Sequence, residues 1–266
     1  MSNDADITAA LAAAASVIDY NDEQHRYHRI DPDGTRVRIP SVTTILGVIA
    51  KPALVWWSAG AAVEHMRSVV AEERAITDDD LEDARRAHQR IANEGANVGT
   101  IVHDTLAAWL TGEEAALPAD DEVMAAAAAV DAWLDARQPE PVAVEQIVVE
   151  SSRPLWAGRL DLVCRLPEFP GGLVVVDLKT NKTGAYPEHL LQNAAYAQCV
   201  EHATGEPVHA TIVVHASKYG AGWSEVVRDS LDWRVDAGMF ERAFDLHRHM
   251  AELRAVTKPK SDEVAA

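Results

Sequence analysis

A short apolar run that ends in two opposite charges constrains this chain more than any other stretch of its sequence. In LVVVDLKTNK, residues 173–182, four apolar residues lead directly into Asp177, and Lys179 follows two positions later. An apolar run of this length, preceded by the turn sequence PEFPGG, predicts a buried strand. Because residues i and i+2 of a strand point to the same face, we expect Asp177 and Lys179 to lie side by side, with Leu178 on the opposite face.

The predicted elements are mostly helical in the first half of the chain and mostly strands in the second. We expect loose or helical structure at 1–19, a β-hairpin at 25–40 around the turn Asp33-Gly34, and helices at 42–50, from Pro52 onward, and at 77–95, 98–110 and 121–136. After Pro141 the pattern predicts strands at 142–150, 158–166, 173–180, 209–216 and 223–229, helices at 187–204 and 232–254, and a disordered tail at 257–266. This order predicts an α/β (α+β) fold, with a mixed sheet flanked by helices.

Composition excludes several classes of protein. The chain is 48% hydrophobic, enough for a sizeable core, yet no apolar run reaches the roughly 18 residues that a membrane span needs. The first residues, MSNDADIT, are acidic, whereas a secretory signal begins with basic residues, so we expect a cytoplasmic protein. The two cysteines, Cys164 and Cys199, are too few for a disulfide framework, a four-cysteine zinc site or a four-cysteine iron–sulfur cluster.

The negative charge of the chain is concentrated in its first half. The net charge is -18 at pH 7, of which residues 1–150 contribute -16 and residues 151–266 contribute -2. The total argues against nucleic acid as a partner, but the second half leaves room for a locally positive groove. Nucleic acid bound in such a groove would be released steeply as salt rises.

A second acid, Asp161, follows apolar residues on the preceding predicted strand. If the two strands pair through the PEFPGG turn, Asp161 and Asp177 converge, and two close carboxylates repel each other unless something neutralises them. A divalent cation such as Mg²⁺ or Mn²⁺, which prefers carboxylate oxygens, would do so. The alternative is a plain cross-strand salt bridge beside a solvated acid.

Four short motifs in a fixed order point to a family. They are Gly99-Thr-Ile-Val-His103, Gly158-Arg-Leu-Asp161, Asp177-Leu-Lys179-Thr180 and Gln192-x-x-x-Tyr196. The set resembles the RecB-type nucleases of the PD-(D/E)XK superfamily, in particular stand-alone phage exonucleases and CRISPR-associated RecB-like nucleases, and the resemblance covers about residues 98–204. The stretch RIPSVTTIL also resembles the start of the phage members. The resemblance implies the restriction-endonuclease-like version of the mixed sheet.

The resemblance assigns a role to each matching residue. His103, Asp161 and Asp177 would be metal ligands, and the backbone carbonyl of Leu178 would add a further oxygen. Lys179 would lie beside the attacking water and the scissile phosphate, where it would stabilise developing negative charge. Asp161, Asp177 and Lys179 would thus form the catalytic set, with Mg²⁺ or Mn²⁺ as the cofactor.

Further residues match positions that flank the family's active site. Glu145 matches an acid that would hold a second metal or orient a water. Gln192 and Tyr196 lie four apart on one predicted helix and therefore share a face; they would contact the DNA backbone, as would Arg159 and Lys182. Each also has a structural interpretation: a solvated edge-strand acid for Glu145, partial core for Tyr196, and ordinary surface positions for the others.

The sequence departs from the family in two respects. Leu160 stands where the superfamily's name places a proline, at a position that varies. Many RecB-like relatives carry an iron–sulfur cluster, for which this chain lacks the cysteines. The chain also has no G-x-x-x-x-G-K-[ST] loop and hence no helicase motor of that type.

These features predict a metal-dependent DNA exonuclease in phage-type DNA recombination or processing, located in the cytoplasm, or in the host cytoplasm if phage-encoded. DNA would be its substrate, and a recombinase or single-strand-annealing protein its partner. The expected organisation is an extension at 1–20, a hairpin and helical region packed on the core at 21–97, a nuclease core at 98–256 and a tail at 257–266. Two alternatives stay open: a non-catalytic module that binds DNA ends or a recombination protein, and an endonuclease with the same chemistry.

Overall fold

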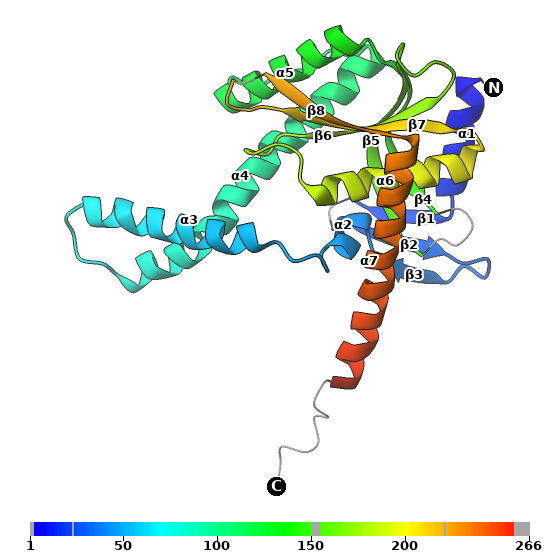
Figure 1. The fold of residues 1–266 in the computed structure, drawn as a ribbon. Helices are drawn as coiled ribbons and strands as arrows, with labels where there is room; N and C mark the ends of the chain where they lie inside the picture. Colours follow the sequence, from blue (N-terminus) through cyan, green and yellow to red (C-terminus); the bar gives the residue numbers. More distant parts are fainter. Residues whose placement is uncertain (1–2, 23, 151–154, 221, 258–266) are drawn as a thin grey trace.

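A five-stranded mixed sheet forms the centre of the protein (Figure 1). The computed structural model describes residues 3–22, 24–150, 155–220 and 222–257. The strands of this sheet lie in the order β4-β5-β6-β7-β8, with bounds β4 Glu140–Val149, β5 Ala157–Arg165, β6 Leu173–Lys179, β7 Val208–Ala216 and β8 Trp223–Asp229. Only β6 and β7 are parallel, and α6 connects them. The predicted mixed sheet is thereby confirmed.

Helices cover both faces of this sheet. Their bounds are α1 Asp4–Ala15, α2 Val42–Leu46, α3 Pro52–Ala71, α4 Asp78–Thr111, α5 Asp121–Arg137, α6 Pro187–Thr204 and α7 Ser230–Thr257. One core cluster joins the sheet to α1, α2, α6 and α7, and a second joins it to α4 and α5. Val175 of β6 belongs to the first cluster, whereas Val174, Val176 and Leu178 belong to the second. This alternation places the side chains of Asp177 and Lys179 on the α6 face of the sheet, as the period of two predicts.

The long helix α4 differs from the sequence prediction. Two helices, at 77–95 and 98–110, were expected, but residues 78–111 form one helix, which begins with a capping box between Thr77 and Asp80 and ends at Gly112 with φ 76°. The glycines in this stretch lower helix propensity, but no proline interrupts it, so the hydrogen-bond ladder continues. Gly99 lies against the end of β6, where an added Cβ would approach Thr180 Oγ1 to 3.3 Å.

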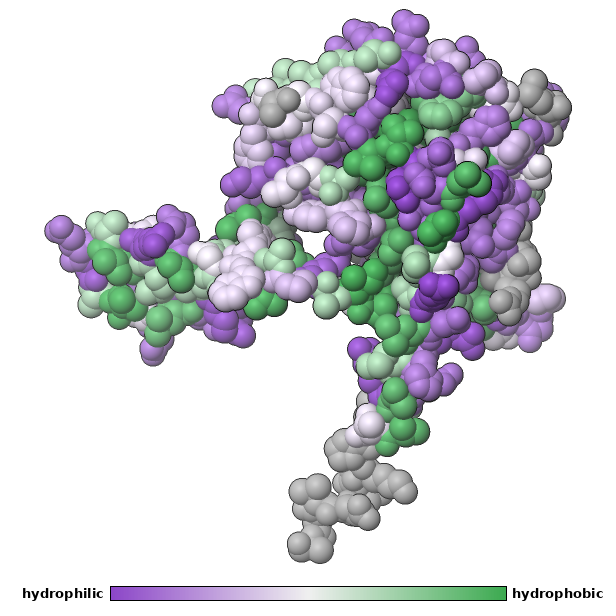
Figure 2. Space-filling view, viewed as in Figure 1, coloured by the Kyte–Doolittle hydropathy of each residue, from purple (hydrophilic) through white to green (hydrophobic). Residues whose placement is uncertain are grey.

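Helix α3 and the first half of α4 form an arm that projects from the body (Figure 1). Pro52 begins α3, as predicted. Figure 2 shows apolar residues along this arm, and Val55, Trp56, Val63 and Val70 are exposed on it. The arm buries one face of α3 against α4 and leaves a second apolar face exposed.

A separate three-stranded sheet lies beside the end of β5. Its strands are β1 Ile18–Asn21, β2 Arg26–Ile30 and β3 Arg36–Ile39, all antiparallel. The hairpin β2–β3 confirms the prediction, whereas β1 was not anticipated. The Ala157 N–H donates to the Pro40 carbonyl at 3.2 Å, and Tyr27 and Ile39 share a small core with Val149 and Ala157. These contacts fix the three-stranded sheet against the central one.

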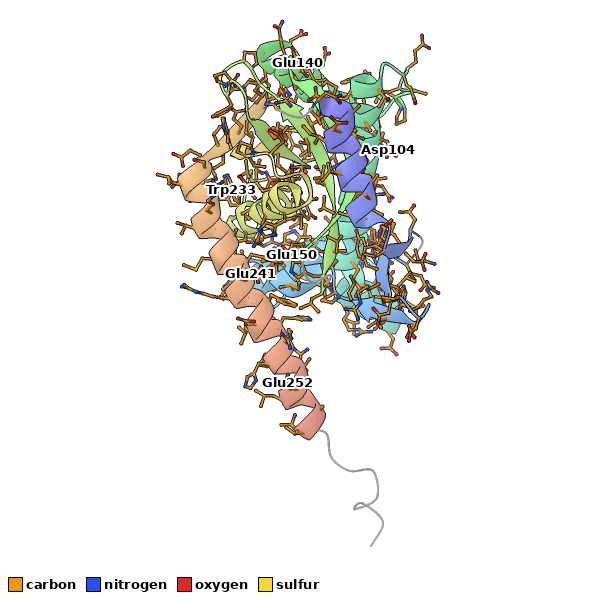
Figure 3. The ribbon with its side chains drawn as sticks, turned by 90° about the vertical axis from the view of Figure 1, so that its right-hand side faces the viewer. Asp104, Glu140, Glu150, Trp233, Glu241 and Glu252 are labelled. Carbon is orange, nitrogen blue, oxygen red and sulfur yellow. The ribbon has the colours of Figure 1, made fainter. Side chains whose placement is uncertain are left out.

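Other predicted boundaries differ by a few residues. Ser41 caps α2 as expected, but α2 ends at Leu46 rather than continuing to residue 50. Helix α7 starts at Ser230, and Figure 3 shows it running from Trp233, which packs on the sheet, through Glu241 to Glu252 at its projecting end. Of the predicted disordered tail, residues 258–266 lie outside the described residues. Among the described helices, none has the length and apolar character required to span a membrane.

Helix α6 begins with an unusual cap that depends on pH. Pro187 opens the helix, and the Tyr186 N–H donates to Nδ1 of His189 at 3.1 Å. Burial and the nearby charge of Lys179 lower the pKa of His189 to about 4, although Glu188 opposes this shift. The cap therefore requires a neutral imidazole, because only the unprotonated Nδ1 can accept this hydrogen bond.

We predict that the stability contributed by His189 is lost as the pH falls from about 6.5 toward 4. The folded pKa lies below the unfolded one, so the unfolded chain binds the proton more tightly in that window. Denaturant unfolding of the wild type and of His189→Asn, which keeps an acceptor that does not titrate, should differ by about 1–2 kcal/mol more at pH 7 than at pH 4.5. An unchanged difference would contradict this assignment of the cap.

Candidate active site

Most of the predicted site residues line one cavity of about 430 Å³; Asp177, Leu178 and Lys182 do not. Its walls come from four parts of the fold: α4, the strands β4 to β6, the face of α6 that carries Gln192 and Tyr196, and the three-stranded sheet with α2. Its lining includes His103, Glu145, Arg159, Asp161, Lys179, Gln192 and Tyr196. Asp104, labelled in Figure 3, marks the stretch of α4 that reaches it. Residues far apart in the sequence thus meet where α4 crosses the sheet.

His103, Glu145 and Asp161 form the tightest cluster of candidate ligands, and we refer to them as the His–Glu–Asp triad. Each offers one ligand atom, and these atoms lie within 4.8 Å of one another. Nδ1 of His103 is 3.3 Å from Asp161 Oδ1 and 3.9 Å from Glu145 Oε1. The helix α4 supplies the imidazole, and the antiparallel pair β4–β5 supplies the two carboxylates.

A local backbone distortion brings Glu145 into the triad. Its φ is 49°, in the left-handed region that non-glycine residues rarely adopt, and the residues on either side, Val144 and Gln146, pair normally with Leu162 and Leu160. Such strained positions are uncommon within a strand and are often found at functional sites.

The carboxylate of Asp161 takes the place of a backbone acceptor where two strands separate. The ladder between β5 and β6 covers only Leu162–Cys164 on the β5 side. Beyond it, Asp161 Oδ2 accepts a hydrogen bond from the Leu178 N–H at 2.6 Å. This short charge-assisted bond fixes the orientation of Asp161 and joins β5 to the end of β6.

Asp177 and Lys179 lie next to each other, as the strand periodicity predicts; we refer to them as the Asp–Lys pair. Lys179 Nζ is 2.5 Å from Asp177 Oδ2, and the Asp177 side chain is only 1% exposed. Gln192 Nε2 donates to Asp177 Oδ1 at 3.3 Å and to Tyr196 Oη at 3.1 Å. Asp177 therefore turns toward Lys179 and Gln192, and it is not one of the three residues in the tight cluster.

The charges of this site shift the protonation of its members. Burial, reinforced by the charge of Asp161, raises the pKa of Asp177 to about 6, although Lys179 opposes the shift. Burial would also raise the pKa of Asp161, but His103, Lys179 and the Leu178 N–H outweigh it and hold that pKa below its usual value. Burial raises the pKa of Glu145, with a further contribution from Asp161. Two neighbouring aspartates thus respond in opposite directions, which marks a strongly interacting group of acids.

The adjacent carboxylates favour the charged forms of Lys179 and His103. Burial alone would lower the pKa values of both groups, but the carboxylates raise them more, so both pKa values lie above their ordinary values. Lys179 is consequently an ammonium at neutral pH. Because a metal ligand must be a neutral imidazole, binding of a cation by His103 competes with protonation of its ring.

The donor set fits a divalent cation. The triad offers one imidazole nitrogen and carboxylate oxygens, the atoms that Mn²⁺ and Mg²⁺ accept. Asp177 Oδ2 is fully buried and lies 2.5 Å from Lys179 Nζ. A cation bound by the triad would reduce the repulsion among the nearby carboxylates, which are buried or partly buried.

The remaining predicted residues occupy different positions. Arg159 pairs with Glu145, with 3.0 Å between Nε and Oε2, and lines the cavity, as do Gln192 and Tyr196. Lys182 is not among the lining residues; its Nζ lies 5.9 Å from the centre of the Tyr219 ring. Leu178 contributes its N–H to Asp161.

Several lining residues were not anticipated from the sequence. Tyr20, His25, Tyr27, Ser41 and Thr43 come from the three-stranded sheet and α2. The hairpin and the Ser41 cap were predicted from local signals, but no local signal indicates that this segment packs beside β5.

Sequence comparison assigns the family. The family model of the PD-(D/E)XK nuclease superfamily matches residues 75–262, well over half of the chain. The chain belongs to the PD-(D/E)XK nuclease superfamily. This membership indicates metal-dependent hydrolysis of phosphodiester bonds with DNA as the substrate, in agreement with the triad of candidate ligands.

Other comparisons are more distant. No match was found among curated proteins. Among solved structures, the crystal structure of SSO0001 is similar at 14% sequence identity and a TM-score of 0.34, over 73% of this chain and 86% of that one. A similarity of this extent does not allow fold or function to be transferred, so the superfamily assignment rests on the sequence match.

The packing of Gly158 against Tyr196 leads to a stability prediction. An added Cβ at Gly158 would overlap the Tyr196 ring, which is buried and cannot move aside freely. We expect Gly158→Ala to lower the free energy of unfolding by about 1–3 kcal/mol, measured in denaturant. Gly60→Ala is the matched control, because nothing lies within 4 Å of its added Cβ and alanine favours the helix. Equal effects of the two substitutions would contradict the packing argument.

Proposed function

We propose that this protein is a divalent-metal-dependent DNA exonuclease of the RecB-like type. The observation that carries the proposal is that the His–Glu–Asp triad and Lys179, the ammonium of the Asp–Lys pair, line one cavity. A cluster of metal ligands beside a buried ammonium suits phosphodiester hydrolysis, because negative charge develops on the phosphate as water attacks. A role in phage-type DNA recombination or processing, alongside a recombinase or single-strand-annealing protein, is supported by the resemblance of the motifs alone.

The residues divide into three roles. His103, Glu145 and Asp161 would hold the cation, and Asp177 and the Leu178 carbonyl on β6 are the further ligands that the resemblance suggests. When bound, the Mg²⁺ or Mn²⁺ ion supplies Lewis-acid activation and stabilises negative charge on oxygen. Lys179, kept protonated by Asp177, offers Nζ to the phosphate oxygen on which charge develops.

Asp177 and Gln192 position this ammonium. Asp177 holds Lys179 Nζ at 2.5 Å, and Gln192 donates to the other carboxylate oxygen. Tyr196 accepts the second Gln192 hydrogen bond, so the motif Gln192-x-x-x-Tyr196 orients the Asp–Lys pair and also lines the DNA-facing cavity. Arg159 and Lys182 are the proposed contacts to DNA on either side.

The choice of an exonuclease over an endonuclease is supported by the resemblance of the motifs to stand-alone phage exonucleases.

The proposal predicts a dependence on DNA topology and on metal. With Mg²⁺ or Mn²⁺, the protein should degrade linear DNA and leave covalently closed circles intact, as followed by gel electrophoresis, and EDTA should stop the reaction. Asp161→Asn should be inactive under every condition. Cleavage of closed circles would instead indicate an endonuclease with the same chemistry, and inactivity on every DNA form with both metals would refute the enzymatic proposal.

A double substitution separates a catalytic from a structural Asp–Lys pair. We expect Lys179→Met to lower the cleavage rate by about 10²–10³-fold or more, because a donor to the developing charge is lost. Lys179→Met combined with Asp177→Asn removes the unpaired buried carboxylate and should restore thermal stability without restoring activity. Arg165→Ala, which removes one positive charge at the far end of β5, is the control and should keep its activity. Recovery of cleavage in the double variant would mean that the pair only stabilises the fold.

A further inference from the structure

The three-stranded sheet presents an aromatic surface to the cavity. Tyr20 of β1 and Tyr27 of β2 are stacked, with ring centres 4.6 Å apart and an interplanar angle of 28°. We refer to these two residues as the tyrosine stack. The guanidinium carbon of Arg159 lies 5.7 Å from the centre of the Tyr20 ring, and all three side chains line the same cavity as the His–Glu–Asp triad.

The two tyrosines differ in burial. Tyr27 is only 6% exposed and packs with Ile39, Val149 and Ala157, so it belongs to the core of this sheet. Tyr20 is partly exposed, and its Oη forms a hydrogen bond with Nδ1 of His25 at 2.9 Å. Tyr27 therefore supports Tyr20 from one side, and a ligand that reaches Tyr20 from the cavity also meets Arg159, which lies over the Tyr20 ring.

The charge of Arg159 is largely taken up by protein carboxylates. Its Nε is 3.0 Å from Glu145 Oε2, and its NH1 nitrogen is 3.7 Å from Asp22 Oδ1. With two acids beside it, this corner of the cavity repels a phosphate more than the isolated guanidinium would suggest. The guanidinium plane keeps its capacity to stack, which arginine retains while it forms ion pairs. The side chain of Arg159 is 41% exposed.

These features favour an uncharged, flat ligand at this corner. A nucleobase has that chemistry, and stacking of bases on tyrosine and arginine is the common means by which proteins hold single strands without reading their sequence. The corner is joined to the candidate metal site through Glu145, which contacts Arg159 with one oxygen and faces His103 with the other. A base held here belongs to a nucleotide close to the scissile phosphate.

We propose that Tyr20, supported by Tyr27 and flanked by Arg159, is a stacking site for one unpaired nucleobase. This inference rests on the proposed function, from which it takes DNA as the substrate. It adds that the nucleotide beside the reacting phosphate is unpaired, in a single strand or at a frayed end. An unpaired base can offer a flat face to Tyr20, whereas within a duplex both faces of a base are covered by its stacked neighbours.

The test measures binding without cleavage. Metal-free protein in EDTA is titrated into fluorescently labelled single-stranded oligonucleotides, and anisotropy gives the Kd. The oligonucleotides are identical except for a single abasic site, which is moved one position at a time from the end. For the wild type, we expect one position at which loss of the base weakens binding about five- to a hundredfold.

Substitution of Tyr20 should remove this dependence. Tyr20→Leu, which keeps apolar bulk, and Tyr20→Ala should each bind the intact strand with the weaker affinity that the wild type has for the sensitive abasic strand. Their affinity for that abasic strand should be no lower than their affinity for the intact strand. Tyr20→Phe keeps the ring and should behave as the wild type. Trp56→Ala, which removes an exposed aromatic that does not line the cavity, should have no effect.

The outcomes separate this inference from the proposed function. If wild type and Tyr20→Leu, with matching melting temperatures, lose affinity equally at every abasic position, the stacking site is refuted while the nuclease proposal stands. If no oligonucleotide binds and no DNA is cleaved, both fail. Equal affinity of the wild type for a blunt duplex and for the single strand of the same length would also overturn the unpaired state of the bound nucleotide.

Discussion

Three carboxylates, those of Glu145, Asp161 and Asp177, converge where β5 and β6 separate, and the need to neutralise their charge at buried or partly buried positions explains much of the surrounding structure. Asp161 is stabilised by the Leu178 N–H and by His103, and Asp177 is stabilised by Lys179 and Gln192. Each carboxylate thus has its own partners, yet Asp177 keeps a pKa of about 6, well above its usual value, because burial is incompletely compensated. Because the charged form of Asp177 stays unfavourable in the free protein, the site is well suited to bind a cation.

The rest of the fold positions the partners of these acids. Helix α4 continues unbroken past Gly95 and Gly99, and this continuity carries His103 over the sheet to Asp161. The close approach of Gly99 to Thr180 lets the helix lie against the end of β6. On the opposite face, α6 brings Gln192 to Asp177. The imidazole of His103 and the amide of Gln192 therefore come from helices on the two faces of one sheet and meet the acids where β5 and β6 separate.

Local patterns predicted the framework of this site but not its closest contacts. The apolar run before Asp177 was sufficient to predict β6 and the side-by-side arrangement of Asp177 and Lys179, because a strand has a fixed period. The position of Glu145 depends on a backbone φ of 49° within β4, and no residue pattern in the sequence predicts this conformation. For that reason the sequence favoured Asp177 as a companion of Asp161, whereas the geometry gathers Glu145 with Asp161 and His103. The contribution of Tyr20 could not be foreseen, since it depends on tertiary packing of the three-stranded sheet against β5.

The most direct measurement of the central claim is the anomalous scattering of Mn²⁺ in crystals of the protein, recorded above the manganese absorption edge. Our account predicts a strong peak in contact with His103, Glu145 and Asp161 on the Asp177 side of the cavity, and its loss in a His103→Ala crystal grown and soaked in the same way. A cavity with no peak at saturating Mn²⁺, or a peak whose ligands exclude the His–Glu–Asp triad, would contradict it.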